Sequence, residues 1–380
     1  MAKLIDITGK ALSGEWGTDD ESGDGIPVLR TTNFTNEGVV NYNDVVTRTI
    51  TKKNIDEKFL RKGDIIIEKS GGSDKFPVGR VIYFDGEENT YLFNNFTGLL
   101  RVKNQDVWYP RYVFYSLFAN YKRGGTRAYE NKTTGLHNLK TDDYVSRYEV
   151  AEIDKQEQVS ICEKLDKIYA ILKSRELELQ LLDDLITARF VEMFGDPVHN
   201  PYGWNKPELR ELADLKIGPF GSLLHKEDYV EGGHALVNPS HIVDGRIIID
   251  PKLTVSEEKY EELSAYHLKV GDVVMGRRGE MGRCAVVEEE GLLCGTGSLL
   301  IRPKGKVTAD YIQKIISYPT FKKTIEDMAV GQTMPNLNVP IVSGFRIITP
   351  PIEVQNNYYD FVAQVDKSKV VWVLRRLVFA

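Results

Sequence analysis

The most regular spacing of apolar positions lies in the middle of the chain. Apolar side chains recur there at alternating intervals of three and four residues, and the stretch from Lys155 to Phe194 contains no glycine or proline. This pattern predicts one helix of ~60 Å, at ~1.5 Å per residue, whose apolar seam pairs with a second helix. A buried helix of a single globular core is the alternative, and the unbroken length favours the rod. The predicted helix-pairing residues are Leu165, Ile168, Leu172, Leu179, Leu182 and Ile186.

The segments on the two sides of this helix repeat in one order. Residues 1–195 and 205–380 each contain a Gly-rich turn, an apolar run with a polar loop, and a Gly-Asp turn that opens a strand. Each then contains a further helix, an Asn-Leu pair, and a glutamine near the start of the last helix. The offset of roughly 200 residues is too long for a solenoid repeat and indicates a tandem domain duplication.

The repeat predicts an α+β protein with two tandem similar α/β domains separated by long coiled-coil-type helices. Each domain has a helix of its own, predicted around Tyr109–Tyr121 and Ala309–Thr324. The last helix is predicted from about Gln355 and is shortened, because 370–380 lacks the charged heptad continuation. The predicted parts are a first domain at 1–150, a central spacer helix at 151–197, a second domain at 198–350 and the C-terminal helix at 351–380.

Charge is distributed unevenly along the chain. The formal net charge of −6 counts at first against nucleic-acid binding. However, residues 152–194 carry ten acids and six bases, whereas residues 122–140 carry five bases and one acid. Only the surface that touches phosphate has to be basic, so the net charge does not exclude a DNA-binding protein.

The three cysteines, Cys162, Cys284 and Cys294, are widely spaced. They form neither a disulfide framework nor a zinc-binding motif, and we expect reduced thiols packed as small apolar groups. No run of 18 apolar residues predicts a membrane helix, and the N-terminus does not resemble a signal peptide. We therefore expect a cytoplasmic protein without a membrane partner.

Motifs for catalysis are missing from the sequence. There is no GxxxxGK[ST] phosphate loop and no GxGxxG at the start of a βαβ unit. Asn200-Pro201-Tyr202 has one proline fewer than the motif of amino-methyltransferases, and the six histidines show no metal-binding spacing. We expect no catalytic residue, no cofactor and no metal.

Polar loops that contain glycine occupy matching places in the two copies. Arginine reads guanine and asparagine or glutamine reads adenine through paired hydrogen bonds, while other donors hold phosphates. The DNA-binding candidates of the first copy, in 69–76 and 122–140, are Lys69, Ser70, Lys75, Arg127, Tyr129, Asn131, Lys132, Thr133, Thr134 and His137. Those of the second copy, in 276–283 and 331–338, are Arg277, Arg278, Gln332, Thr333, Asn336 and Asn338.

Each of these residues also has an ordinary structural interpretation. A single arginine or lysine is often a solvated surface charge. His137 can complete a turn, and Asn138 and Asn336 can cap loops. The functional interpretation rests on their occurrence in loops at equivalent places of both copies.

The duplicated plan resembles the specificity subunit of Type I restriction–modification systems. Similar strings are FGDPVHNPYGW (194–204), GPFGS (218–222), GTRAYENKTTGLHNLK (125–140) and PPIEVQNNYYDFVAQVDKSK (350–369). The resemblance covers nearly the whole chain through a combination of motifs, and the segment 370–380 departs from it. It implies two target-recognition domains, each followed by a helix, with the helices packed antiparallel.

The resemblance also implies a function. The chain would read a bipartite, asymmetric target on double-stranded DNA without catalysis of its own. It would dock methyltransferase (modification) subunits, two of them, and restriction subunits would join through the complex. Two other classes remain open on the residues alone. One is a DNA methyltransferase or nuclease fragment whose active site escapes the motifs, and the other is a coiled-coil scaffold that does not bind DNA.

Overall fold

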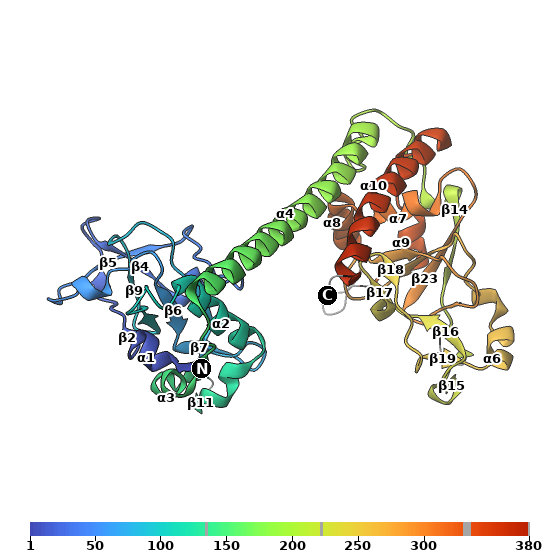
Figure 1. Ribbon diagram of the computed structural model, residues 1–380. Coiled ribbons are helices and arrows are strands. Elements are labelled where there is room, and N and C mark those ends of the chain that lie inside the picture. Colours follow the sequence, from blue (N-terminus) through green and yellow to red (C-terminus); the bar gives the residue numbers. More distant parts are fainter. Residues whose placement is uncertain (134–135, 221–222, 330–335, 379–380) are drawn as a thin grey trace. The chain divides into compact units, whose positions relative to one another are not determined.

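The computed structural model describes residues 1–133, 136–220, 223–329 and 336–378, and gives only the backbone at 132, 133, 136, 226 and 370–378. It divides into two compact units, Met1–Arg175 and Glu176–Ala380, which we call the first and second unit (Figure 1). Among the described helices none is both long and apolar enough to cross a membrane. Cys162, Cys284 and Cys294 are buried free thiols.

The first unit is built from short strands, 3-10 helices (η) and three short α-helices, and it contains the start of α4. Its strands are β1 (Ala2–Lys3), β2 (Leu12–Ser13), β3 (Thr18–Asp19), β4 (Ile26–Leu29), β5 (Val46–Thr49), β6 (Ile65–Glu68), β7 (Ser70–Gly72), β8 (Val81–Tyr83), β9 (Leu92–Phe93), β10 (Thr97–Leu100), β11 (Glu130–Thr133), β12 (Leu136–Leu139) and β13 (Glu149–Val150). Its helices are α1 (Leu4–Thr8), η1 (Thr31–Asn33), η2 (Asp56–Lys58), α2 (Pro110–Lys122), η3 (Gly125–Tyr129), α3 (Thr141–Arg147) and the first part of α4 (Lys155–Phe194).

The second unit contains the end of α4 and a similar series of elements. Its strands are β14 (Ala213–Ile217), β15 (Tyr229–Val230), β16 (His234–Val237), β17 (Ile242–Val243), β18 (Arg246–Ile247), β19 (Thr254–Val255), β20 (Val273–Gly276), β21 (Cys284–Val286), β22 (Leu293–Cys294) and β23 (Ser298–Pro303). Its helices are α5 (Leu209–Leu212), η5 (Lys226–Asp228), η6 (Pro239–His241), α6 (Glu257–Glu262), η7 (Ser264–Tyr266), α7 (Ala309–Ser317), α8 (Pro319–Met328), α9 (Val339–Ser343) and α10 (Ile352–Val378).

The two four-stranded sheets of each unit have the same topology in both units, which confirms the predicted duplication. The strand order β2-β10-β6-β8 of the first unit corresponds to β14-β23-β20-β21 of the second, and both sheets are antiparallel. A smaller sheet, β3-β5-β4-β9, corresponds to β15-β19-β16-β22. In each small sheet the last pair, β4 with β9 or β16 with β22, is parallel. The fold is therefore a mixed helix-and-sheet fold made of two tandem similar domains.

The central strands explain why each unit has a core on both faces of its larger sheet. Successive side chains of a strand point to opposite faces, so Ile65 and Ile67 of β6 pack into one apolar cluster and Ile66 into another. In β20 the same alternation sends Val273 to one cluster and Val274 to another. Because both faces of these central strands are buried, each strand needs a continuous run of apolar residues.

A buried ion pair anchors the Gly-Asp turn before each central strand. Gly63 and Gly271 have φ values of 92° and 85°, which favour glycine. The next residue is an aspartate in both units, and it contacts an arginine that directly follows β10 in the first unit and lies in β23 in the second. The Asp64 Oδ2 to Arg101 Nη2 distance and the Asp272 Oδ2 to Arg302 Nη2 distance are both 2.6 Å, and each aspartate side chain is 2% exposed.

The predicted glutamine makes corresponding backbone contacts in both units. The side chain of Gln158 accepts a hydrogen bond from the backbone N–H of Tyr109 at 2.8 Å and donates to the carbonyl of Ile153 at 3.0 Å. Gln355 accepts from the N–H of Thr308 at 3.1 Å and donates to the carbonyl of Pro350 at 2.9 Å. Both glutamines are buried. Each therefore ties the start of its long helix to the N-cap residue of an earlier helix, α2 in the first unit and α7 in the second.

The long helix has the predicted bounds, and its end packs on α10. Figure 1 shows α4 as one continuous helix, and in the second unit α10 lies beside its C-terminal part. The hydroxyl of Tyr358 donates to the carbonyl of Ile186 at 3.3 Å, and Lys369 Nζ lies 2.6 Å from Asp183 Oδ1. Gly195, with a φ of 74°, follows the last residue of α4.

The helix-pairing residues have different surroundings. Leu165 packs on the core of the first unit and Ile186 on that of the second. Ile168 is 52% exposed, whereas Leu172, Leu179 and Leu182 are half-buried. Side chains beyond Lys369 lie outside the described residues, so pairing of these three leucines with the last helix remains a prediction.

Two predicted helix boundaries differ from the structure. The helix expected at Ala309–Thr324 is two helices, because Pro319 cannot continue α7 and the preceding Tyr318 adopts an extended conformation with ψ of 137°. The last helix begins at Ile352 and its backbone stays helical to Val378, through the segment that lacks the charged pattern. The expectations for Tyr109–Tyr121 and Lys155–Phe194 are confirmed within one residue.

Candidate nucleic-acid interface

The two predicted loops of the first unit meet in one small sheet. Strand β7 lies in the loop 69–76, which we call the Gly-rich loop of this unit. It pairs with β12 of the loop 122–140, so that Ser70 lies opposite Asn138. The backbone N–H of Leu139 donates to the carbonyl of Lys69 at 2.8 Å. Strand β11 completes the sheet in the order β11-β12-β7. Candidate residues that are about 60 positions apart in the sequence therefore share one surface.

In the second unit, the Gly-rich loop (276–283) contacts the described part of the later loop, 336–338, in the same way. The backbone of Arg278 forms a bridge with Asn336, and the N–H of Leu337 donates to the carbonyl of Arg277 at 3.0 Å. The Asn-Leu pair of each copy is thus the partner of its Gly-rich loop. Gln332 and Thr333 lie outside the described residues.

Several first-unit candidates have structural contacts. Lys69 Nζ donates to Ser13 Oγ at 2.9 Å, and burial lowers the pKa of its ammonium. The ring of Tyr129 packs edge-on against Tyr144 and belongs to the core. Asn131 is exposed. Only the backbone of Lys132 and Thr133 is described, in β11, and Thr134 lies outside the described residues.

His137 is buried and bridges two segments of the first unit. Its side chain is 7% exposed, with Nδ1 3.2 Å from Glu130 Oε2 and Nε2 3.6 Å from Asp74 Oδ1. The other oxygen of Glu130 accepts a hydrogen bond from the backbone N–H of Val78 at 2.9 Å. In this geometry His137 holds the β11–β12 hairpin against the Gly-rich loop.

The second-unit candidates divide between exposed and anchored side chains. Arg277 donates to the carbonyl of Leu337 at 2.8 Å, and burial lowers the pKa of its guanidinium. Asn336 Oδ1 accepts from Arg277 at 3.4 Å, and the Asn338 side chain accepts from the N–H of Ile341 at 2.9 Å as the N-cap of α9. Arg278 is exposed. Among the described residues of this group, Arg278 has an exposed side chain that forms no hydrogen bond or ion pair with another described residue, so it is available to a ligand.

A pocket of about 430 Å³ opens beside the loops of the first unit. It is formed by the turn that contains Asn36, the end of the Gly-rich loop, the C-terminal end of α2 and the helix η3. Its exposed cations are Lys75, Lys122, Arg123 and Arg127. None of the described residues that line the pocket carries a carboxylate. We call this the first-unit pocket.

Phe76 and Gly124 shape the first-unit pocket. Lys75 Nζ lies 5.3 Å from the centre of the Phe76 ring, which is 52% exposed. Gly124 has a φ of 76° and ends α2, so the chain can turn directly into η3. Arg127 donates to the carbonyl of Asp74 at 3.1 Å, which joins η3 to the Gly-rich loop. The pocket therefore combines positive charge with one exposed aromatic face.

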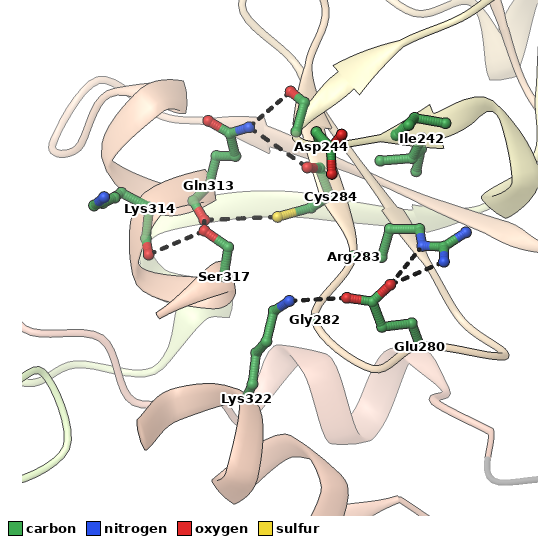
Figure 2. Close-up of a pocket in the computed structure, with 12 residues that line it drawn as sticks. Ile242, Asp244, Glu280, Gly282, Arg283, Cys284, Gln313, Lys314, Ser317 and Lys322 are labelled. Carbon is green, nitrogen blue, oxygen red and sulfur yellow. Dashed lines mark hydrogen bonds and ion pairs between the residues drawn. The ribbon is translucent and has the colours of Figure 1, made fainter. Parts of the chain in front are cut away.

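A second pocket, of about 450 Å³, lies at the corresponding place in the second unit (Figure 2). The β17–β18 turn, the end of the Gly-rich loop, α7 and α8 form it. Glu280 Oε1 accepts from Lys322 at 3.0 Å, and Glu280 Oε2 accepts from Arg283 at 2.9 Å. These two cations lower the pKa of the Glu280 carboxyl. We call this the second-unit pocket.

Comparison with known proteins identifies the family. The model of the Type I restriction modification DNA specificity domain matches the chain twice, at residues 2–181 and 201–370. These two matches cover most of the sequence. The chain belongs to the Type I restriction–modification DNA specificity family. The sequence resemblance stated above is thereby confirmed.

Members of the DNA specificity family are found in both the curated proteins and the solved structures. The type I restriction enzyme MjaX specificity subunit of Methanocaldococcus jannaschii is 27% identical over 175 residues. That match covers 44% of this chain, and the chain spans only 40% of the length of this relative.

Two solved structures show the same fold. The Type I restriction–modification system S subunit from M. genitalium has a TM-score of 0.57 at 16% identity, with 96% of this chain and 88% of that chain covered. A chain from a study of complex assembly and conformational transition of the type I R-M system also has a TM-score of 0.57 at 16% identity, with 99% and 91% covered.

Sequence reasoning missed several residues of the two pockets. Lys122 and Arg123 lie in the basic loop but were not among the candidate readers. Asn36, Phe76 and Glu280 were not predicted either. An alignment of the two copies contains part of the signal, because the turns 25–42 and 233–250 match without a gap and place Asn36 opposite Asp244. Metal ligands were not predicted, and the described residues contain no group of three His, Cys, Asp or Glu side chains suited to a metal.

Proposed function

We propose that this chain recognises DNA sequence for a Type I restriction–modification complex and leaves methylation and cleavage to partner subunits. The observation that supports this most strongly is the first-unit pocket. It places four cations without a carboxylate beside the loops that the duplication had marked as readers. Phosphate contacts of this kind position a protein on DNA, while neighbouring polar side chains read bases.

We infer that each copy reads one half of a bipartite target. The loops have the same place in both units but different residues, for example Ser70 in the first and Arg278 in the second. A protein with two different reading surfaces favours an asymmetric target. In this proposal residues 1–150 and 198–350 read DNA, and 151–197 and 351–380 form the helical part. The free thiols and the partners suit a cytoplasmic protein.

The test is binding of duplex DNA by the full-length chain over a series of salt concentrations. We expect Lys75→Gln and Arg127→Gln each to weaken binding on all duplex sequences alike and to lower the salt slope by about one. Lys173→Gln is the matched control, because this exposed lysine of α4 lies outside the pocket. Absence of binding by the wild-type chain at low salt would contradict the proposal.

A stripe of exposed leucines on α4 supports the docking of methyltransferase subunits, two per complex, with restriction subunits joining through them. Leu177, Leu181 and Leu185 are 59%, 56% and 47% exposed. Their spacing of four residues places them along one face of the helix. In the second unit the neighbouring face of α4 is occupied by α10, through contacts such as Ile186 with Tyr358. The stripe therefore remains accessible to a partner helix.

Docking can be tested by capture of purified methyltransferase subunits on the full-length chain. We expect the double variant Leu181→Glu with Leu185→Glu to lose most of the captured subunit, because it puts charge into an apolar contact. Lys167→Glu changes the net charge by the same amount on an exposed site of the same helix and should retain capture. Equal capture by all three proteins would place the docking surface elsewhere.

A further inference from the structure

The two pockets correspond in position but differ in charge. Each is formed by the turn after a 3-10 helix (η1 or η6), the end of the Gly-rich loop, and the two following helical segments. The first-unit pocket has four cations and no described carboxylate. The second-unit pocket has Arg283, Lys314 and Lys322 together with Asp244 and Glu280. Corresponding surfaces of one duplicated fold thus offer very different sites to an anion.

Glu280 lies between two of the three cations of the second-unit pocket. Figure 2 shows its carboxylate between Lys322 and Arg283, with one oxygen toward each. The side chain is 54% exposed. Arg283 also donates to the carbonyl of Pro239 at 3.2 Å, so its guanidinium has a second anchor that does not depend on Glu280. Arg283 therefore keeps one contact that does not involve the half-exposed carboxylate of Glu280.

In the first unit, the carboxylate that balances the corresponding arginine lies in the sheet and not in the pocket. Arg80 corresponds to Arg283, because the backbone N–H of Glu68 donates to the carbonyl of Arg80 and that of Gly276 donates to the carbonyl of Arg283. The carboxylate partner of Arg80 is Glu68, which is 5% exposed on strand β6. At the position of Glu68 the second unit has Gly276, and a Cβ there would lie 3.1 Å from Pro239. The second unit therefore places its balancing carboxylate in the pocket instead of in the sheet.

We propose that Glu280 is an internal stand-in for a DNA backbone phosphate, and that the second-unit pocket binds phosphate only after this carboxylate has left Arg283 and Lys322. The proposal rests on the proposed function, because it takes DNA as the ligand. It assigns different tasks to the two pockets. The first-unit pocket accepts a phosphate directly, whereas the second-unit pocket exchanges one anion for another.

Phosphate chemistry fits this exchange. A guanidinium and an ammonium bind phosphate oxygens through charge-assisted hydrogen bonds, as they bind the carboxylate. An exposed ion pair contributes little to stability, so the carboxylate can be displaced. Gly282 has a φ of 75°, and a Cβ there would lie 2.8 Å from Lys322 Cγ. The loop therefore approaches α8 closely enough for one anion to contact both cations.

The proposal is tested with the full-length chain, a fluorescent duplex of unrelated sequence, and anisotropy over a salt series. Glu280→Gln leaves the two cations without their anion, and we expect roughly three- to tenfold tighter binding and a salt slope steeper by ~0.9, the value for one more phosphate contact. Glu326→Gln is the matched control: it removes one exposed carboxylate from α8, four residues beyond Lys322. We expect it to change binding less than twofold.

A double-mutant cycle identifies the cation involved. Lys322→Gln alone should have little effect, because Glu280 already neutralises this lysine, while Lys322→Gln in the Glu280→Gln background should remove the gain. A second variant does not depend on Glu280. Asn36→Asp places a carboxylate in the first-unit pocket, at the exposed position that corresponds to Asp244. We expect it to weaken binding and to make the salt slope shallower.

The outcomes separate this inference from the function on which it rests. If Glu280 only holds Arg283 in place, Glu280→Gln weakens DNA binding, and the proposal is overturned. An effect no larger than that of Glu326→Gln also overturns it. If no variant and no wild-type chain binds duplex DNA at any salt concentration, the proposed function itself fails. If Glu280→Gln melts at a lower temperature than the wild type, Asn36→Asp decides, and unchanged binding by that variant counts against the proposal.

Discussion

The two units share several internal polar contacts and differ in the residues that line their pockets. Asp64 with Arg101 and Asp272 with Arg302 have equal distances, and Gln158 and Gln355 make the same pair of backbone contacts. Both aspartates also accept a hydrogen bond from the backbone N–H three residues before them, at 2.8 Å and 2.7 Å. The pockets, in contrast, differ in charge and in their aromatic content.

This difference shows which residues a duplicated reader has to retain. A buried carboxylate or amide without its partner leaves an unsatisfied polar group, which costs stability in either unit. An exposed side chain beside a loop has no such requirement, so the two copies are free to carry different residues there. Internal contacts therefore report the fold, and external ones report what each copy binds.

The largest effect is expected for the buried aspartates. Asp64→Asn and Asp272→Asn each remove the anion from a buried pair, and we expect each to destabilise its own unit by about 3 kcal/mol. Hydrogen exchange resolves the two units. Exchange in β6 should rise for the first variant, and exchange in β20 for the second.

The exposed pair of Asp19 with Arg48 provides the control for the aspartate variants. Asp19 is 88% exposed, so Asp19→Asn should change stability by less than ~1 kcal/mol. If Asp64→Asn had the expected effect and Asp272→Asn behaved like this control, the two units would share a geometry without sharing its energetic importance.

A smaller effect, restricted to one half of the target, is expected for Arg278. Arg278→Ala removes an exposed side chain from the second unit, and we expect a loss of ~1–3 kcal/mol in discrimination at the base it reads. Sequencing of methylated sites in cells that carry the variant complex measures this directly. Arg346→Ala, which removes an arginine that is 67% exposed outside the loops, should leave the target unchanged. A change in the half-target assigned to the first unit would reverse our assignment of units to half-targets.

Arg277, the neighbour of Arg278, has a structural contact instead of an exposed side chain. Its Nε donates to the carbonyl of Leu337, so it holds the Gly-rich loop against the Asn-Leu pair. Sequence reasoning treated Arg277 and Arg278 as equivalent readers. The structure gives them different surroundings because neighbouring residues of an extended segment point to opposite sides.

The fold was largely predictable because it depends on local patterns that occur twice. The absence of glycine and proline between Lys155 and Phe194 predicted the long helix, and the Gly-Asp turns predicted the start of β6 and β20. The break between α7 and α8 was not predicted, although a proline at position 319 disfavours a continuous helix. The prediction followed the matching order of motifs in the two copies, in which the first copy has one helix at this place.

The site was less predictable, because its geometry depends on residues that are distant in the sequence. Lys75 and Arg127 lie in one pocket because β7 pairs with β12, and that pairing was not predicted from the sequence. The internal contact of His137 with Glu130 connects residues on paired strands, and its burial could not be read from a polar loop. Glu280 looks like one acid in a basic loop until Lys322 of α8 is seen beside it.

The packing of α4 has a consequence for how a reading module can be exchanged between proteins. Phe190 and Phe194, the last aromatic residues of this helix, are fully buried in the core of the second unit beside Tyr358. A gene segment that encoded only residues 198–350 would transplant the second reader without the two rings that fill its core. A recombination event or an engineered swap retains a folded second module only if the crossover falls upstream of Ile186, inside the helix instead of at its end.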